Sequence, residues 1–336
     1  MNKKLISIIF ALLAAIFYSI NIPLSKILLQ EIDPIYMAAF LYFGAGIGML
    51  IYSKIFSKEK EEPKLTRKEL PYTIGMIVLD IIAPISLMLG LSTASSANAS
   101  LLNNFEIVAT SIIALVFFKE KISRKMWYAI FLITLSSVLL SFEGVESFQF
   151  SYGSIYILIA CVCWGLENNC TRMLSSKSTT EIVILKGIFS GLGSLIVALI
   201  THEQFTSIIY VLYALLLGFI SYGLSIFFYV KAQSVLGAAK TSAYYAVAPF
   251  IGSFLSFVIF REELSKNYLI ALIIMIMGTI VVIMDTVIIN HSHMHKHVIT
   301  HTHDGTTHEH VIVHEHPHNH MFNRENQHLH KHILKE

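Results

Sequence analysis

The sequence predicts an all-α integral membrane protein with ten transmembrane helices in two inverted five-helix repeats, followed by a flexible histidine-rich cytoplasmic tail. Three observations favour this fold. Of the 336 residues, 55% are hydrophobic and 14% are charged, whereas a soluble domain of this length needs a larger polar surface. Long apolar runs recur along the chain, and its two halves resemble each other. Fifteen of the sixteen histidines follow residue 290.

Length and apolarity define the expected helices, because crossing the bilayer core takes about 20 mostly apolar residues. Such runs lie at about 4–22, 34–53, 70–89, 95–117, 125–142, 152–171, 180–200, 207–229, 238–260 and 267–286. Lipid-exposed sheet is excluded, since unpaired backbone groups in hydrocarbon cost several kcal/mol each. The first run is too long for a signal peptide, and no small-residue cleavage site precedes a soluble domain, so we expect it to span the membrane.

The distribution of lysine and arginine predicts the orientation. With the amino terminus inside, the cytoplasmic side collects Lys3, Lys4, the basic loop 53–70 and most other basic residues, while the opposite side keeps only Lys26, Arg261 and Lys266. Cytoplasmic loops of membrane proteins carry an excess of positive charge. We therefore expect a multi-pass protein of the cytoplasmic membrane with both termini in the cytoplasm.

The two halves of the chain can be aligned. The segment "FFKEKISRKMWYAIFLITLSSVLLSFE" (117–143) matches "IFREELSKNYLIALIIMIMGTIVVIMD" (259–285), and "AAIFYSINIPLSK" (14–26) matches "ACVCWGLENNCTR" (160–172). An odd number of helices in each repeat makes the second copy enter from the opposite side, as in many transporters. The expected domains are a first repeat over 1–145, a second over 146–289 and the tail over 290–336.

These segments resemble the drug/metabolite transporter superfamily, in its ten-helix EamA-type branch. The similarity covers about residues 4–286 and rests on two pairs of motifs. One motif is Tyr18, Ser19, Asn21 and Lys26, repeated as Trp164, Gly165, Glu167 and Arg172. The other is "LGAAKTSAYYAVAPFIGSFLSFVIFREELS" with Pro249, repeated as "SSANASLLNNFEIVATSIIALVFFKEKIS", where Ile107 replaces the proline beside Glu106. The resemblance implies alternating access around a midplane cavity lined by helices 1, 3, 4, 6, 8 and 9.

Ionisable residues inside the apolar runs are the first candidates for a site, because each costs roughly 2.5–3.5 kcal/mol at the bilayer centre. They are Asp80, Glu106, Glu167, Lys186 and Lys240. The alternative is a set of internal ion pairs or helix-end side chains that reach the interface. Glu106 and Glu167 are the leading candidates for contact with solute or coupling cation. The other candidates for the site are Asp80, Asn21, Asn103, Asn104, Trp164, Asn168, Tyr222, Tyr244 and Tyr245.

One helix offers a second kind of site. Cys163, Glu167 and Cys170 are spaced i, i+4 and i+7 and so share a helical stripe. Thiolate and carboxylate, with Asn168 or Asn169, suit a borderline divalent cation. The alternative is two small thiols packed beside a carboxylate.

The tail has the strongest local pattern. Its odd-numbered histidines are His291, His293, His295, His297, His301 and His303, and its even-numbered ones are His308, His310, His314, His316, His318 and His320. The change of parity falls at Asp304-Gly305, a favoured hairpin turn. If that turn closes a hairpin, each residue faces the one whose number brings the sum to 609, so that His301 faces His308. The paired histidine positions then lie on one face of the two-stranded ribbon. We expect a metal-templated hairpin that is disordered without metal; the alternative is a low-complexity run with no role.

The leading hypothesis is a transporter that moves a small solute, with a tail that binds Zn, Ni, Co or Cu. Two alternatives stay open: a divalent metal transporter, and a non-transporting membrane metal sensor or store. The sequence contains no catalytic constellation, so we do not expect an enzyme, and we expect no required cofactor. It also lacks the basic stripe that would indicate nucleic-acid binding. The expected partners are membrane lipid and the solute, with a homodimer left open.

Overall fold

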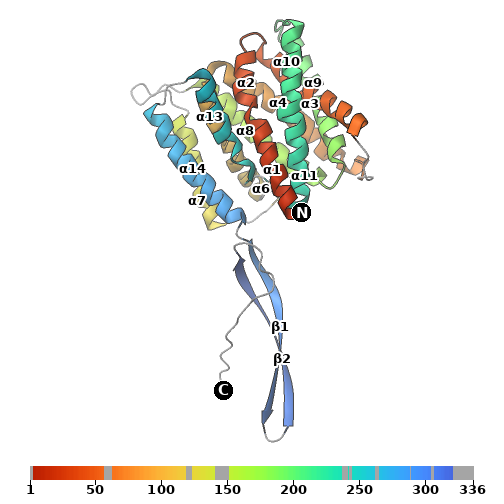
Figure 1. Cartoon of the computed structure of the whole chain (residues 1–336), viewed down its shortest axis with the longest axis vertical. Coiled ribbons are helices and arrows are strands. Elements are labelled where there is room, and N and C mark those ends of the chain that lie inside the picture. Colours follow the sequence, from red (N-terminus) through yellow and green to blue (C-terminus); the bar gives the residue numbers. More distant parts are fainter. Residues whose placement is uncertain are drawn as a thin grey trace. The chain divides into compact units, whose positions relative to one another are not determined.

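The computed structural model describes residues 3–56, 63–118, 123–140, 151–236, 241, 244–261, 265–287, 289–303 and 306–320 (Figure 1). The chain divides into two compact units, Met1–Ile283 and Met284–Glu336. The first unit is helical, and the second contains a pair of β-strands.

The helical segments follow the apolar runs of the sequence. They are α1 Lys3–Ser19, α2 Asn21–Leu28, α3 Pro34–Phe56, η1 Arg67–Glu69, α4 Leu70–Thr93, α5 Ser96–Leu102, α6 Phe105–Phe118, α7 Arg124–Leu140, α8 Tyr152–Leu174, α9 Thr179–Ile200, α10 Ile208–Gly218, η2 Phe219–Leu224, α11 Ser225–Leu236, α13 Ala248–Phe260 and α14 Lys266–Val287.

Within the described residues, seven continuous helical stretches are long and apolar enough to cross a membrane. They are Leu5–Leu28, Pro34–Ile55, Arg67–Thr93, Ser96–Phe117, Thr179–Ile200, Ile208–Leu236 and Lys266–Asp285. The predicted count of ten is therefore not confirmed. Each remaining run does contain a helix, but α7 and α13 have only 17 and 13 residues, and α8 carries a polar stretch around Glu167 that lowers its mean hydropathy.

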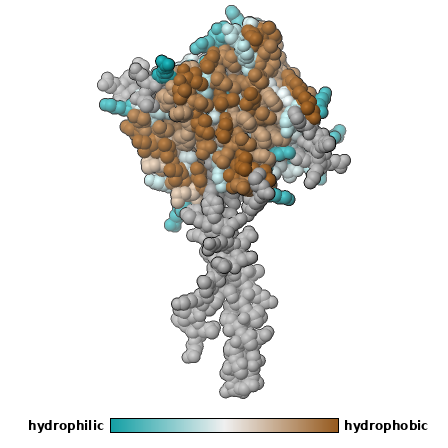
Figure 2. All heavy atoms as spheres, in the orientation of Figure 1, coloured by the Kyte–Doolittle hydropathy of each residue, from teal (hydrophilic) through white to brown (hydrophobic). Residues whose placement is uncertain are grey.

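The surface of the helical unit is largely apolar. Figure 2 shows hydrophobic residues over most of its visible face. Large side chains such as Phe131, Leu216 and Ile273 are 61%, 57% and 59% exposed. Soluble monomers rarely expose contiguous apolar patches larger than a few hundred Å². The exposed apolar surface therefore fits a lipid environment.

Four of the apolar runs contain an irregular segment among the described residues. α1 and α2 are separated at Ile20, α5 and α6 at Asn103-Asn104, and a turn at Ala246-Val247 precedes α13. The fourth interruption is the π-helix η2, between α10 and α11. The repeat alignment places Asn104 opposite Ala246, so two of these breaks fall at nearly equivalent places. Irregular backbone at membrane depth is tolerated where protein or a cavity surrounds it.

Close backbone contacts hold α3 against α9 and α10. A Cβ atom added to Gly187 of α9 would collide with the backbone of Gly46 on α3, and one on Gly218 would collide with the backbone of Leu41. Small residues let neighbouring helices approach this closely, and such packing stabilises membrane helix bundles. The position of α3 matters for the site, because Tyr42 lies on it.

Two charged side chains form hydrogen bonds with backbone groups that lack a partner within their own helix. Lys26 Nζ donates to the carbonyl oxygens of Leu91 and Ala94 at 2.6 and 2.9 Å, where α4 ends. The Glu203 carboxylate accepts from the backbone N–H groups of Ile35 and Tyr36 at 3.0 and 2.9 Å, where α3 begins. Unpaired carbonyls at a helix end attract cations and unpaired N–H groups attract anions. Both contacts join segments that are distant in sequence.

In the second unit, β1 (Ile289–His303) and β2 (Thr306–His320) form an antiparallel pair. The register places His291 opposite His318, His293 opposite His316, His295 opposite His314 and His301 opposite His308. These are the pairs whose numbers sum to 609. The turn residues Asp304 and Gly305 lie outside the described residues. An isolated two-stranded ribbon is marginal in water, so the flexibility of the tail stays a prediction.

Candidate functional site

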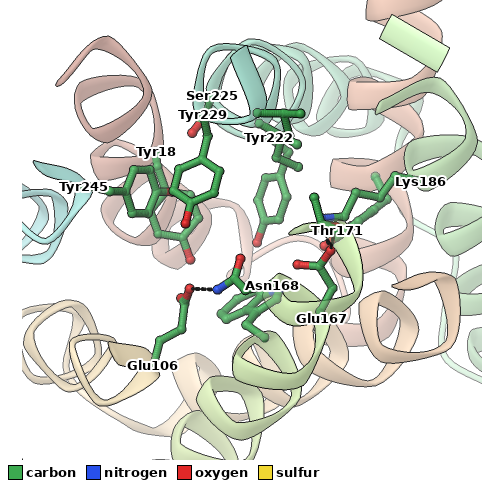
Figure 3. A pocket seen from close by; sticks show the side chains of 14 residues that line it. Tyr18, Glu106, Glu167, Asn168, Thr171, Lys186, Tyr222, Ser225, Tyr229 and Tyr245 are labelled. Atoms are coloured by element: carbon green, nitrogen blue, oxygen red, sulfur yellow. Dashed lines mark hydrogen bonds and ion pairs between the residues drawn. The ribbon is translucent and has the colours of Figure 1, made fainter. Parts of the chain in front are cut away.

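A cavity lies among helices from both halves of the chain (Figure 3). Its lining combines charged, polar and aromatic side chains: Tyr18, Tyr42, Glu106, Trp164, Glu167, Asn168, Thr171, Lys186, Tyr222, Ser225, Ile226, Tyr229, Val230 and Tyr245. A concave, mostly apolar space with a few convergent polar groups is the usual form of a small-molecule site.

A buried ionic cluster closes one side of this cavity. Lys186 Nζ on α9 lies 3.1 Å from Asp80 Oδ2 on α4 and 2.9 Å from Glu167 Oε1 on α8. The Tyr42 hydroxyl donates to Asp80 Oδ1 at 2.8 Å, and the Thr171 hydroxyl donates to Glu167 Oε1. Removing one member of such a cluster leaves an uncompensated buried charge, which is strongly destabilising. Lys186 therefore supplies the counter-charge to both carboxyl groups.

Glu106, at the start of α6, occupies another part of the wall. Its Oε1 accepts a hydrogen bond from Asn168 Nδ2 at 2.6 Å, a short distance typical of a charge-assisted bond. This contact joins α6 to α8, and Figure 3 shows the two side chains meeting at the floor of the cavity. In the described part of the chain, no lysine, arginine or histidine forms an ion pair with Glu106.

Aromatic rings form much of the remaining wall. The Tyr18 ring centroid lies 5.9 Å from that of Tyr222, 5.7 Å from that of Tyr245 and 6.4 Å from that of Trp164. Tyr229 and Tyr245 stand edge to face, with centroids 5.1 Å apart. Rings at these separations attract each other through their quadrupoles. They also present π-faces and hydroxyl groups to anything held in the cavity.

A second, smaller cavity adjoins the first and shares Tyr18, Glu106, Tyr229 and Tyr245 with it. Its other lining residues include Asn103 and Asn104 at the break between α5 and α6, and Ala246 and Pro249 at the break before α13. Asn103 Nδ2 donates to the Tyr18 hydroxyl at 3.1 Å. The side-chain amide of Asn104 is buried and lacks any hydrogen-bond partner among the described residues.

Most of the residues predicted for the site lie in or directly behind these cavities. Asn21 is buried behind the first one, where its Nδ2 donates to the Tyr222 hydroxyl at 3.3 Å. Asp80 contacts two residues of the lining, Lys186 and Tyr42, and is not itself among the lining residues. Tyr244 lines neither cavity, although its neighbour Tyr245 lines both. Lys240 lies outside the described residues.

The two thiols predicted as transient metal ligands lie elsewhere. Neither Cys163 nor Cys170 lines either cavity, and Cys170 Sγ packs near Gly75 of α4. Over the described ranges, no group of three or more histidine, cysteine, aspartate or glutamate side chains is placed to hold an ion. This geometry supports the alternative reading of packed thiols, and we leave both out of the proposed site.

Six residues that line the first cavity had no place in the sequence prediction: Tyr42, Thr171, Ser225, Ile226, Tyr229 and Val230. Thr171 could have been found, because it follows Glu167 by one helical turn on the same face. Tyr42 and Tyr229 lie in apolar helices where a tyrosine looks like any other packed aromatic residue. Their role follows only from the way α3 and α11 pack around the cavity.

Comparisons with known proteins agree with this architecture. The model of the EamA-like transporter family matches residues 5–142 and 151–284, one range in each half of the chain. An uncharacterized transporter of Methanothermobacter thermautotrophicus is 26% identical over 298 residues, covering 83% of this chain and 86% of that protein. The uncharacterized transporter YyaM of Bacillus subtilis is 23% identical over 258 residues, covering 73% and 83%. One solved crystal structure shares the fold, with a TM-score of 0.62, 15% identity, and coverage of 83% of this chain and 96% of that one.

Proposed function

Because the chain belongs to the EamA-like transporter family, we propose that it moves a small solute across the cytoplasmic membrane by alternating access between its two repeats. The observation that carries this proposal is the cavity at Glu106, Glu167 and Lys186, which has a polar floor and aromatic walls. A membrane receptor or metal store needs no such space in its helical core. In transporters, solute sites lie at the interface of repeats, beside interrupted helices.

The two glutamates suit different parts of this function. Glu167 already forms an ion pair with Lys186 and accepts a hydrogen bond from Thr171, so its charge is balanced within the helical core. Glu106 has only the Asn168 amide as a partner in the described structure and faces the cavity, so it is free to contact the solute. We therefore assign Glu106 to solute contact and the cluster around Lys186 to coupling between the helices that surround it.

The break between α5 and α6 and the turn before α13 support the transport cycle. Both lie at the second cavity, and each could change its angle without disturbing a continuous helix. Hinges in transporters and enzymes are commonly a few residues at the ends of elements. Rocking about these points would open the Glu106 region to one side of the membrane and close it to the other.

The test is uptake into proteoliposomes of a panel that spans organic cations, neutral solutes, organic anions and Zn²⁺, Ni²⁺ and Co²⁺. The preparations are the full chain, a chain truncated after Asn290, and the Glu106→Gln and Glu167→Gln variants. We expect uptake of one solute class above the level of empty liposomes, and its loss in Glu106→Gln. Folded, correctly incorporated protein that moves no class of solute would overturn the transport proposal.

The tail carries a second proposal, which is that it binds a divalent metal such as Zn, Ni, Co or Cu. The observation in its favour is the register, which sets four pairs of histidine positions directly opposite each other. Opposite positions on an antiparallel pair have Cβ atoms about 4.5–5.5 Å apart, a spacing that suits imidazoles converging on one ion. The metal would stabilise a ribbon that is marginal alone, and binding would weaken below about pH 6.5 as the imidazoles protonate.

Comparing the full and truncated chains separates the roles of the tail and the helical unit. If the truncated chain still moves metal, metal is the cargo and the helical unit conducts it. If neither form moves metal while the full chain binds it, the tail senses or stores metal and the cargo is an organic solute. The second result is expected, because the described helical residues offer no cluster of three metal-ligating side chains.

A further inference from the structure

We propose that the solute is a small organic cation, held with its ammonium group between the Glu106 carboxylate and the rings of Tyr18, Tyr229 and Tyr245. This inference rests on the proposed function, because it names the class of solute for the same cavity.

The first argument is the balance of charge around the cavity. Three carboxyl groups gather here, those of Asp80, Glu106 and Glu167, and Lys186 is the one cation that the described residues bring to them. Lys186 sits between Asp80 and Glu167 at 3.1 and 2.9 Å, so its charge is directed at those two groups. Among the described residues, the Glu106 carboxylate has a hydrogen bond from the Asn168 amide and no ion pair. A buried carboxylate without a counter-charge is costly, and a cationic solute would remove that cost.

The second argument is the aromatic character of the cavity wall that faces Glu106. Figure 3 shows the rings of Tyr18, Tyr229 and Tyr245 grouped on the side of the cavity toward which the Glu106 carboxylate points. Their centroids are 5.7 Å apart for Tyr18 and Tyr245, and 5.1 Å apart for Tyr229 and Tyr245. Aromatic faces around a carboxylate attract ammonium groups through the ring quadrupole, and such cages recognise alkylated amines in other proteins.

The third argument is an unused polar group at the far end of the same space. Asn104 is 1% exposed, and both its amide nitrogen and its amide oxygen lack hydrogen-bond partners within the described structure. It lines the second cavity, which meets the first at Tyr18, Glu106, Tyr229 and Tyr245. Buried polar groups in native proteins are nearly always paired, so an orphaned amide beside a cavity indicates a missing partner. A hydroxyl or carbonyl group at the other end of the cation would supply it.

The same observations argue against other solutes. An organic anion would meet the uncompensated Glu106 and the aromatic π-faces, both of which repel negative charge. A bare divalent metal would need at least three converging ligands, and the described residues offer no such group. A small organic monocation would give Glu106 the counter-charge that the described residues do not supply, and its apolar part would meet the aromatic wall.

The experiment uses three ligands that share a phenyl ring and differ in charge: 2-phenylethylamine, 2-phenylethanol and phenylacetate. Binding to the full chain in detergent is followed by the fluorescence of Trp164, which lines the cavity, in a Trp127→Phe background that removes the surface tryptophan. We expect the protonated amine to bind at least about tenfold more tightly than the alcohol, and the carboxylate to bind most weakly. Equal binding of amine and alcohol would overturn the proposal.

Two cavity variants and one surface variant refine the test. Glu106→Gln keeps the shape of the side chain and should abolish the preference for the amine over the alcohol, and its melting temperature in detergent shows whether the variant is folded. Tyr229→Leu should weaken amine binding several-fold and alcohol binding less. Glu31→Gln is the matched control, since Glu31 is exposed and lies outside both cavities. A preference for the amine that survives in Glu106→Gln would contradict the assignment.

Flux measured on the same proteins distinguishes failure of this inference from failure of the proposed function. Amine binding that depends on Glu106, without amine uptake by proteoliposomes, would support the cation site and overturn transport. Uptake of an anion or a metal, without amine binding that depends on Glu106, would support transport and overturn the cation site.

Discussion

Lys186 Nζ lies 2.9 Å from Glu167 Oε1, and this contact joins two helices of the second half of the chain at the wall of the cavity. The same lysine holds Asp80 of the first half at 3.1 Å. One buried cation therefore links the two halves of the chain. Its removal tests how far the fold depends on this charge.

Replacing Lys186 with methionine should destabilise the protein by about 3–5 kcal/mol, because Asp80 and Glu167 would be left buried without a counter-charge. Thermal unfolding in detergent measures the change. The triple variant Lys186→Met, Asp80→Asn, Glu167→Gln removes all three charges and should recover most of the lost stability. If the single variant melts at the temperature of the parent protein, the cluster does not carry the role we give it.

Asn168 orients the Glu106 carboxylate, so Asn168→Ala should weaken solute binding. Hydrogen bonds to charged groups contribute about 1.5–3 kcal/mol, which corresponds to a loss in affinity of roughly ten- to a hundredfold. Titration of the solute with the Trp164 signal measures it. Asn98→Ala is the control, since the side chain of Asn98 lies outside both cavities. Unchanged affinity in Asn168→Ala would show that Glu106 is positioned by other contacts.

Gly187→Leu should prevent α9 from approaching α3. Even a Cβ atom at this position would overlap the backbone of Gly46, so the helices would have to separate. Overpacking typically costs about 1–3 kcal/mol, and more where backbone meets backbone. Gly75→Ala is a milder comparison, because its Cβ would meet only the Cys170 side chain at 3.2 Å. Melting temperatures of the two variants measure the difference; equal values would argue against the close contact of α3 and α9.

The histidine register of the tail can be tested without changing its composition. Exchanging His314, His316, His318 and His320 with the residues that precede them moves these histidines to the other face of the ribbon, because side chains alternate along a strand. Affinity for Ni²⁺ or Zn²⁺ should fall about tenfold or more, as measured by competition with a chromogenic chelator. A tail with shifted histidines and unchanged affinity would show that metal binding needs only the number of histidines.

Hydropathy and internal repetition were sufficient to predict the helical unit. The apolar runs contain the observed helices because a bilayer imposes their length and apolarity directly on the sequence. The costly residues Glu106, Glu167 and Asp80 could be singled out for the same reason. The count of ten spans is not confirmed. In α8, polar residues of the candidate site take the place of apolar ones and lower the mean hydropathy of the helix.

What the sequence could not supply was the arrangement of side chains in three dimensions. Asp80 and Lys186 are separated by more than a hundred residues, and only the packing of α4 against α9 brings them together. Nothing in a list of polar residues distinguishes Glu167, which pairs with Lys186, from Glu106, which forms no ion pair within the described residues. Tyr244 was a candidate for the cavity wall, but it lines neither cavity, whereas its neighbour Tyr245 lines both.

The π-helix η2 sets the angular phase of the helix that follows it. A π-turn holds one more residue than an α-turn, and each residue of an α-helix advances roughly 100° around the axis. Every side chain of α11 is therefore rotated by about that angle from where an unbroken continuation of α10 would place it. Tyr222 lies within the turn, and Ser225 and Tyr229 follow it, all three at the cavity. Deleting one residue from this turn would rotate the cavity-facing side of α11 away from the cavity, while the composition of the helix would stay almost unchanged.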